Sequence, residues 1–337
     1  MFKGAAVNRL VGLDGLRGMA ALMVFLFHLA VIFELDIPEL PFYLGVDLFF
    51  ALSGFVMARS YEARLRTELP ALRFIIIRYR RLWLPLAVGS VIGCALVYFT
   101  EGLDFAALLA FVAILFFMPA PWMPQGSFIF NLPAWSLFVE IVCNALHAAF
   151  FVWASNLLLA IMLAVSAVVL ITSTVMHGSM IWGNHIESTL AAIPRGTTSY
   201  LIGILIFRIW GEKPFGNSPL IAILGLPLFF SMGFMLPAYL EAILVVFIVS
   251  PLALRASLAL GEAKWASNLG MLSYPLYAVH FPILASAKAV GMSELAGGLV
   301  TLACAIYVTV VYERRRRGIP LPSFGLGAWM RARRENS

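Results

Sequence analysis

An arginine and a histidine near the beginning of the chain have the spacing of residues on one helical face. Arg17 and His28 are eleven positions apart in the stretch LDGLRGMAALMVFLFHLA, which on a helix leaves the side chains about 20° apart around the axis and about 16 Å apart along it. Asp14 falls within about 40° of the same line. Ionisable side chains are costly inside a membrane, and those found there usually face the bundle interior and serve a function.

These three residue types suggest proton transfer beside an anion site. An imidazole has an ordinary pKa of about 6.5, so His28 could accept a proton from an attacking hydroxyl at neutral pH. The alternative is a buried histidine hydrogen-bonded to a neighbouring helix. Arg17 could bind a phosphate or thioester, or it could anchor the helix by snorkelling to the membrane surface. Asp14 could orient Arg17 as an i, i+3 pair or serve the structure alone.

Two further arginines have a spacing that suits a phosphate group. Arg78 and Arg81 are three positions apart in FIIIRYRRLW, so they share a face and could donate together to phosphate oxygens. Without other information a run such as RYRR is a topology signal. No metal site is expected, because His147, His177 and His185 lack the spacing of a zinc site.

The composition requires a membrane. The 337 residues are 62% hydrophobic and 12% charged, with a mean hydropathy of +0.95, whereas soluble domains are about 25% charged. Charged residues in the first apolar run argue against a cleaved signal peptide, so we expect that helix to remain. The net charge of +6 is accounted for by basic residues that orient the chain in the membrane. It implies membrane lipids rather than nucleic acid as partners.

The apolar runs predict an all-α integral membrane protein with a bundle of about ten transmembrane helices. We place these helices at about 18–35, 43–58, 82–99, 134–153, 157–176, 192–209, 219–236, 238–254, 269–287 and 295–312. An eleventh run, Phe105 to Met118, has only 14 residues and is expected to be a short re-entrant segment. The predicted transmembrane domain is 1–313, followed by a basic cytoplasmic tail at 314–337.

The distribution of basic residues predicts the orientation. With ten crossings, every lysine and arginine except Arg195 and Lys288 falls on one side of the membrane. The positive-inside rule makes that side the cytoplasm and places both chain ends there, in a multi-pass protein of the plasma (inner) membrane. Arg195 and Lys288 are expected outside or near the outer surface, together with acidic residues such as Glu34.

Five segments in sequence order carry a family resemblance. They are LVGLDGLRGMAALMVFLFH, GVDLFFALSGFVMARS, FIIIRYRRLW, AWSLFVE and LSYPLYAVHFP. Together they resemble the membrane-bound acyltransferase 3 family, which moves acyl groups onto sugars and other acceptors. The resemblance implies an enzyme with no permanently bound cofactor. It would take an acyl group from a cytoplasmic acyl-CoA, commonly acetyl-CoA, and transfer it to a carbohydrate or lipid-linked sugar on the other side.

The resemblance also implies roles for particular residues. Arg17 and His28 match the family's first motif, which favours catalysis, and the pair Arg78 and Arg81 would bind the acyl-CoA. Glu140 is a lone carboxylate in an apolar run and must be protonated or paired. It matches the family's WSL-x-x-E pattern, so it could pair with an arginine or orient the acceptor, with a structural polar clamp as the alternative.

Other features of the motifs favour simpler explanations. His280 matches the last motif, yet a satisfied core histidine in an aromatic belt is the simpler account. Six residues separate Asp47 from Ser53, which places them on different helical faces, and Gly54 is typical of close helix packing. One departure from the family is the position of Pro85, which would shift the beginning of the third helix.

The sequence is also compatible with a second class of function. A polytopic transporter or flippase of a glycan or acyl-bearing substrate would use the same intramembrane His, Arg and Glu as a polar path. Such proteins often contain structural repeats, and the second half of this chain shows no convincing repeat of the first-half motifs.

Overall fold

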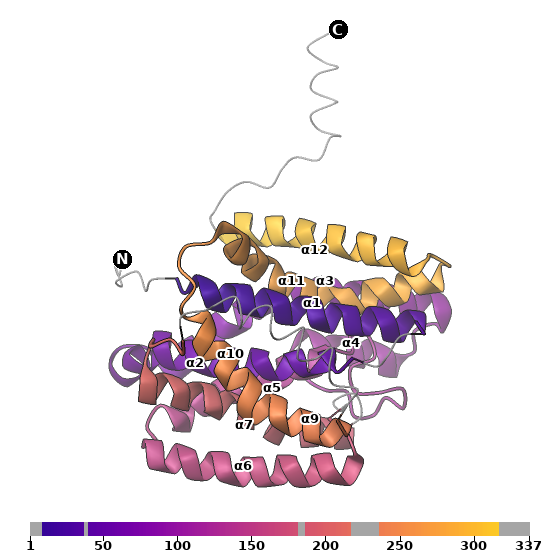
Figure 1. The fold of residues 1–337 in the computed structure, drawn as a ribbon. Coiled ribbons are helices and arrows are strands. Elements are labelled where there is room, and N and C mark those ends of the chain that lie inside the picture. The colour runs from indigo at the N-terminus through magenta and orange to yellow at the C-terminus, as the bar shows by residue number, and fades with distance from the viewer. Residues whose placement is uncertain (1–8, 37–39, 181–185, 217–235, 317–337) are drawn as a thin grey trace.

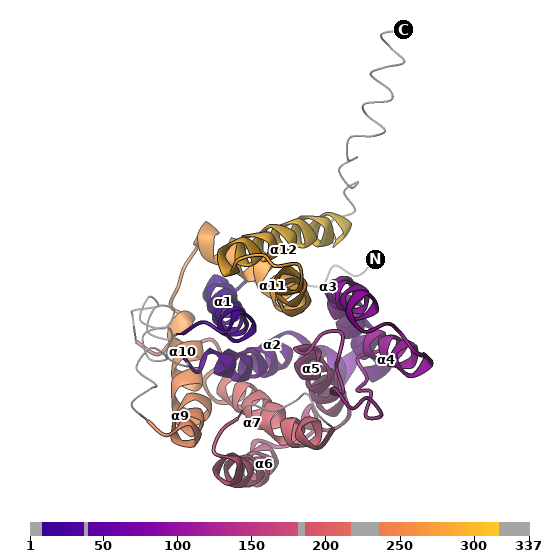
Figure 2. The same ribbon diagram turned by 90° about the vertical axis from the view of Figure 1, so that its right-hand side faces the viewer.

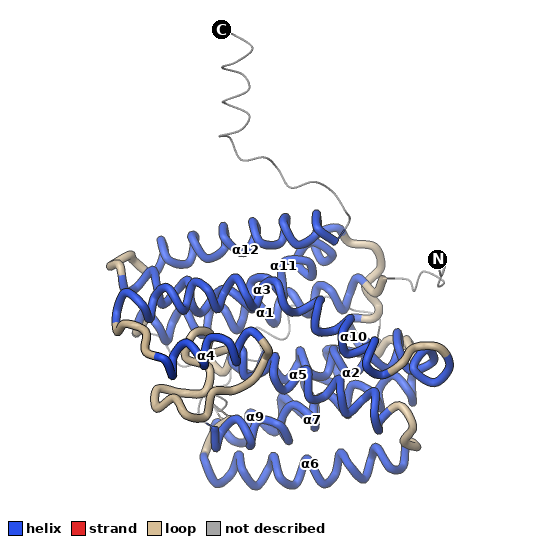
Figure 3. The backbone as a smooth tube through the Cα atoms, turned by 180° about the vertical axis from the view of Figure 1, so that it is seen from behind, coloured by secondary structure: helices blue, strands red, loops and turns tan. Residues whose placement is uncertain are grey.

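The computed structural model describes residues 9–36, 40–180, 186–216 and 236–316, and every regular element in these ranges is helical (Figures 1 and 3). The predicted helix at 219–236, His185 and the basic tail beyond residue 316 lie wholly or almost wholly outside the described residues. Seven of the described helices are long and apolar enough to cross a membrane. The all-α multi-pass architecture predicted from the sequence is therefore confirmed.

The helix boundaries extend beyond several of the apolar runs. The helices are α1 (Val11–Phe33), α2 (Gly45–Thr67), α3 (Ala71–Thr100), α4 (Phe105–Leu115), α5 (Ala134–Leu146), α6 (Asn156–His177), α7 (Ile186–Trp210), α9 (Ala238–Leu244), α10 (Ser250–Ser257), α11 (Lys264–Ala289) and α12 (Glu294–Arg316). A π-helical turn, His147–Phe151, continues α5, and another, Val245–Val249, joins α9 to α10. The additional turns of α1 and α3 carry charged residues that hydropathy alone could not include.

The helices form a stack in which α2 is central. Viewed along the helices, the order is α12, α11, α1, α2, α7 and α6, with α3, α4 and α5 on one side and α9 and α10 on the other (Figure 2). Glycine residues allow the backbones of neighbouring helices to approach each other closely. A Cβ atom on Gly54 of α2 would lie 2.0 Å from the backbone oxygen of Tyr200 in α7. One on Gly270 of α11 would lie 2.8 Å from Cα of Asp14 in α1. The packing role predicted for Gly54 is confirmed.

The short helix α4 turns back rather than crossing. Tyr79 and Trp83 of α3 both donate to the backbone oxygen of Leu115 at the end of α4, at 2.9 and 3.1 Å. The indole of Trp122 then donates to the backbone oxygen of Ala106 at 3.2 Å, so the chain has returned to the beginning of α4. The segment predicted to be re-entrant is therefore re-entrant.

Pro85 lies inside α3, and other helices bind the carbonyls beside it. Proline lacks an N–H group, so the carbonyl of Arg81 loses its partner within the helix. The hydroxyl of Tyr312 in α12 donates to this carbonyl at 3.1 Å, and the hydroxyl of Tyr274 in α11 donates to the next carbonyl, that of Leu82. The helix begins at Ala71 and continues through the proline, so the proline fixes the position of Arg81 between α11 and α12.

A second proline produces the same arrangement in α11. Pro282 frees the carbonyl of Ala278, and the side-chain amide of Asn131 donates to it at 2.8 Å. Asn131 is 1% exposed, so this hydrogen bond satisfies polar groups that water does not reach. The loop before α5 is thereby attached to the part of α11 that carries His280.

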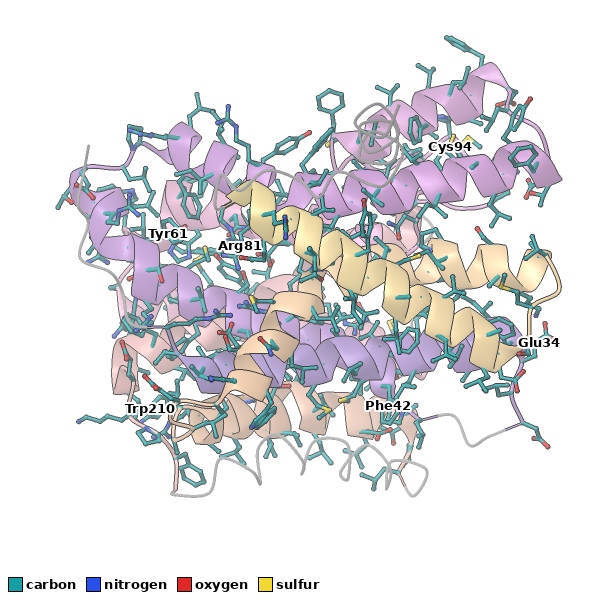
Figure 4. All side chains as sticks on the ribbon, turned by 90° about the horizontal axis from the view of Figure 1, so that it is seen from above. Glu34, Phe42, Tyr61, Arg81, Cys94 and Trp210 are labelled. Atoms are coloured by element: carbon teal, nitrogen blue, oxygen red, sulfur yellow. The ribbon has the colours of Figure 1, made fainter. Side chains whose placement is uncertain are left out.

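The two ends of the bundle differ in charge. Arg9, Arg59, Arg81 and Glu313 line one cavity at what we call the basic end. At the opposite end, the far end, Lys288 donates to Glu34 at 2.6 Å. Figure 4 shows Tyr61, Arg81 and Trp210 at the basic end, and Glu34 and Cys94 at the far end. Residues near both ends of the described chain therefore lie at the basic end.

Arg195 of α7 is buried inside the bundle and paired with a carboxylate. The sequence predicts it outside or near the outer surface and identifies no partner for it, and the structure shows a side chain that is only 1% exposed. Its guanidinium binds the carboxylate of Asp47 with an Nη2–Oδ2 distance of 2.6 Å, and it also donates to the backbone oxygen of Met180 at 2.6 Å. Trp135 packs beneath it, 5.4 Å from ring centroid to Cζ. A buried partner carboxylate compensates the charge that would otherwise exclude arginine from the interior.

Candidate active site

Five helices enclose a small cavity in the half of the bundle nearer the basic end. Its volume is about 100 Å³, and α1, α2, α3, α5 and α11 each contribute to its wall. Its polar lining consists of Arg17, Ser53, Arg78, Arg81, Ser136, Glu140, Tyr274 and Tyr277. We call it the inner cavity. Four residues singled out from the sequence, namely Arg17, Arg78, Arg81 and Glu140, therefore meet around one space.

Glu140 is held by three donors that converge on one oxygen. Its Oε1 accepts from Nη2 of Arg78 at 2.9 Å, from the hydroxyl of Ser53 at 2.6 Å and from the amide of Asn144 at 3.2 Å. The carboxylate is thus paired with an arginine, as a carboxylate in an apolar segment requires. Sequence reasoning did not foresee Ser53 or Asn144 as its partners. Asn144 follows Glu140 by four residues, a spacing that places both on one helical face.

The inner cavity has an excess of positive charge. Three arginines face one carboxylate around it. Arg78 is 5% exposed, and its Nε and Nη1 atoms are buried without a hydrogen-bond partner among the described residues. Buried donors without partners are unfavourable by about 1 to 3 kcal/mol each. The cavity is therefore suited to an anionic or strongly hydrogen-bond-accepting ligand.

A larger cavity of about 500 Å³ continues the inner cavity to the basic end. Arg17, Arg81 and Tyr274 line both spaces and so mark their junction. Asp14 lies in the larger cavity, 2.5 Å from Nε of Arg9 and 3.8 Å from Nη1 of Arg17. This position, outside the inner cavity, suits the orientation of Arg17 rather than contact with reacting atoms.

His28 lies apart from both cavities. Its Nδ1 is 3.0 Å from Nε2 of His280 and 3.0 Å from the backbone oxygen of Val24. The His280 ring lies 5.8 Å from Tyr277, which in turn lies 5.4 Å from Phe49. Phe49 and Tyr277 both line the inner cavity, and we call them the aromatic layer. The layer lies between the arginines and the histidine pair, so Arg17 and His28 share a helix but not a cavity.

A third cavity lies at the far end beside His28. Its volume is about 550 Å³, and Glu101, Asp104, Gln125 and Phe281 contribute to its wall. The Phe281 ring packs edge-to-face against the His28 ring with a centroid distance of 5.4 Å. Phe281 therefore connects the wall of the far-end cavity to the His28 ring.

Sequence reasoning did not identify His280 as a partner of His28. It expected a satisfied core histidine, and His280 is indeed fully buried with its Nδ1 2.8 Å from the backbone oxygen of Tyr277. The available signal was the spacing of Tyr274, Tyr277 and His280 in LSYPLYAVHFP, which repeats at about one helical turn. Asp47 and Ser53 face different partners, as their spacing predicts.

These features define a multi-pass helical membrane protein with an arginine-lined cavity reached from one end and a histidine near the other. A family profile described as "Acyltransferase domain" matches residues 10–314. The chain belongs to the acyltransferase 3 family, and the protein is an acyltransferase. A relative from Rhizobium radiobacter, named "Protein 2 in picA locus", is 37% identical over 184 residues, which are 49% of this chain and 95% of the relative. No solved structure matches the chain.

Proposed function

We propose that the protein is an acyl-CoA-dependent O-acyltransferase of the plasma (inner) membrane, with the basic end in the cytoplasm. The observation that carries this proposal is the excess of arginine around the inner cavity, above all the buried Nε and Nη1 atoms of Arg78, which have no partner among the described residues. Its proposed acceptor is a hydroxyl of a cell-surface or lipid-linked carbohydrate, and its proposed acyl group is acetyl.

The two cavities at the basic end match the two halves of coenzyme A. The phosphate-bearing half is bulky and anionic, which suits the larger cavity with Arg9 and Arg59 near the bundle surface. The pantetheine arm is narrow and ends in the thioester, which suits the inner cavity. Arg81 and Arg17 at the junction would bind phosphate oxygens, and Arg78 would donate to the acyl carbonyl or a neighbouring amide oxygen.

The proposed chemistry takes place at His28. An acceptor hydroxyl enters through the far-end cavity, and Nε2 of His28 removes its proton as the oxygen attacks the thioester carbon. A C–O bond forms, the C–S bond breaks, and the thiolate leaves toward the basic end, where it takes up a proton from water. The proton on Nε2 of His28 is then released to water in the far-end cavity, which restores the neutral base. The acyl group must first pass the aromatic layer, either still attached to coenzyme A or after relay to a side chain.

The far-end cavity has the chemistry of a carbohydrate site. Glu101, Asp104 and Gln125 offer oxygen acceptors, and the phenyl ring of Phe281 offers an apolar surface for a sugar ring. Two carboxylates disfavour acceptors whose negative charge lies near the reacting hydroxyl. We therefore expect that hydroxyl to belong to a neutral sugar unit.

The proposal is tested with the purified full-length protein in lipid nanodiscs. The protein is incubated with acetyl-CoA and a cell-surface glycan fraction, and free thiol release is measured together with the mass of the glycan. We expect thiol release that depends on the acceptor and acetylated glycan in equal amount. In a parallel assay the protein is reconstituted in sealed vesicles, and movement of glycan across their membrane without thiol release would overturn the proposal in favour of a flippase.

A further inference from the structure

We infer that His280 is a positioning residue that holds the proton of His28 on Nδ1 and so leaves Nε2 of His28 free to act as the base. This inference rests on the proposed function in one respect, namely that His28 is the base. The contact itself, between Nε2 of His280 and Nδ1 of His28 at 3.0 Å, is independent of any substrate.

The surroundings of His280 fix its tautomer. Its Nδ1 lies 2.8 Å from the backbone oxygen of Tyr277 and 3.1 Å from that of Leu276. Carbonyl oxygens only accept hydrogen bonds, so this nitrogen must carry the proton. In a neutral imidazole the other nitrogen is then an acceptor, and His280, being 0% exposed, is in an environment that favours the neutral form. His280 therefore presents a lone pair on Nε2 to His28.

The tautomer of His28 follows from that of His280. Its Nδ1 faces the lone pair of His280 Nε2 and the backbone oxygen of Val24, each at 3.0 Å. Two acceptors around one nitrogen require that nitrogen to donate, so His28 carries its proton on Nδ1. Its Nε2 then has an open lone pair, which is the atom that general-base chemistry requires.

The opposite arrangement would bring lone pairs together. If Nε2 of His280 carried the proton and donated to His28, the Nδ1 atom of a neutral His280 would face two carbonyl oxygens without a hydrogen between them. Nδ1 of His28 would face the Val24 oxygen in the same way. These unfavourable contacts occur in an interior where electrostatic interactions are only weakly screened. The geometry thus supports one direction for the whole chain of hydrogen bonds.

In many active sites a nucleophile and its base are accompanied by a group that orients the base. Here His280 is that orienting group, and it carries no formal charge. A base is commonly oriented by another group that accepts the hydrogen bond of its second nitrogen. A carboxylate in that position would add a charge at membrane depth, which is unfavourable. Once His28 has taken a proton on Nε2, its Nδ1–H still donates to Nε2 of His280. The proton of His280 stays on its Nδ1, which donates to the helix carbonyls.

The tautomer can be measured by solid-state NMR of the ¹⁵N-histidine-labelled full-length protein in lipid. The His28 signals are identified by their loss in His28→Gln. We expect the wild-type protein to show His28 protonated on Nδ1, and His280→Leu to show a mixture with the Nε2-protonated form. His177 is an internal reference, because its Nδ1 lies 2.8 Å from the oxygen of Ser173 in the same i−4 arrangement on the exposed side of α6.

Kinetics then separate positioning from packing. His280→Leu should lower kcat by about tenfold or more with an unchanged KM for acetyl-CoA, because the donor cavity lies beyond the aromatic layer. His280→Gln places an amide oxygen near the position of Nε2 and should restore much of kcat and a single His28 tautomer. His177→Leu is the control and should change neither measurement.

The outcomes distinguish this inference from the proposed function. Protonation of wild-type His28 on Nε2 overturns the inference even if transfer is observed. Full kcat in His280→Leu also overturns it. Absence of thioester transfer in the wild-type protein refutes the proposed function, and full transfer by His28→Gln refutes the role of His28 as base. In either case the NMR measurement still decides whether His280 sets the His28 tautomer. Because that measurement is made on the wild-type protein and needs only His28→Gln for assignment, it does not depend on the folding of His280→Leu.

Discussion

Replacing Arg78 and Arg81 by alanine removes two of the three arginines around the inner cavity, and we expect donor binding to weaken strongly. Arg78 donates once to Glu140, and its Nε and Nη1 atoms lack partners among the described residues. A hydrogen bond from a charged donor contributes about 1.5 to 3 kcal/mol. One such contact therefore corresponds to about tenfold to more than a hundredfold in the dissociation constant.

The structure distinguishes the two arginines. Arg78→Ala also leaves Glu140 without its cation, although Ser53 and Asn144 still donate to the carboxylate. We expect this variant to fold with reduced stability and with the larger loss of affinity. Arg81 lines both cavities and its side chain is exposed, so Arg81→Ala should affect binding alone. Lysine at either position should rescue only partly, because it cannot form the planar fork of a guanidinium.

The assay is equilibrium binding of a non-transferable thioether analogue of acetyl-CoA to purified protein in nanodiscs. Arg80→Ala is the matched control, because Arg80 belongs to the same helix and is exposed but lines neither cavity. Its affinity for the analogue should equal that of the wild type. An unchanged dissociation constant in the Arg78→Ala, Arg81→Ala double variant would reduce these arginines to topology signals and refute the donor site.

Three further expectations concern the base, the topology and the loop before α5 that is attached to α11 through Asn131. His28→Gln should lower the transfer rate by about 10² to 10⁴ with near-normal expression. The wild-type rate should fall on acidification because only neutral imidazole is a base. Substantial transfer by His28→Gln would make Glu140 the next candidate for the base. A single cysteine at Arg316 should react with a membrane-impermeant thiol reagent only in opened cells, whereas one at Asp36 should react in intact cells. Labelling at Arg316 from outside would contradict the proposed orientation with the basic end in the cytoplasm. Asn131→Leu should lower the free energy of unfolding by about 1 to 3 kcal/mol, because the Ala278 carbonyl loses its donor; an unchanged melting temperature would refute this assignment.

The sequence predicts features that depend on local spacing. One continuous helix carries Arg17 and His28, the short run before α5 turns back, and Asp47 and Ser53 face different neighbours. Each of these follows from helical periodicity or from the length of an apolar run, which neighbouring residues determine.

Contacts between distant segments could not be predicted in this way. His280 is 252 residues from His28, and Arg195 is 148 residues from Asp47. Periodicity identifies the face on which a residue lies but not the helix that packs against that face. Arg195 shows the consequence, because the charge pattern places it outside or near the outer surface but does not identify the buried carboxylate that pairs with it.

The separation of arginines and histidines also cannot be read from one helix. Arg17 and His28 are aligned along α1, which favours a single continuous polar site. The intervening rings of Phe49 and Tyr277 come from α2 and α11, and only the packing of those helices shows that the site has two compartments.

The aromatic layer has a consequence for the energetics of the cell. A continuous hydrated path from the arginines through the histidine pair to the far end would conduct protons and dissipate the electrochemical gradient across the membrane. Phe49 and Tyr277 interrupt that path with apolar ring faces. In the proposed reaction the thioester end of the acyl-CoA is uncharged, so it would enter between these rings where hydronium would lose its hydration. The same two side chains would therefore admit the acyl donor and block the leak of free protons between turnovers.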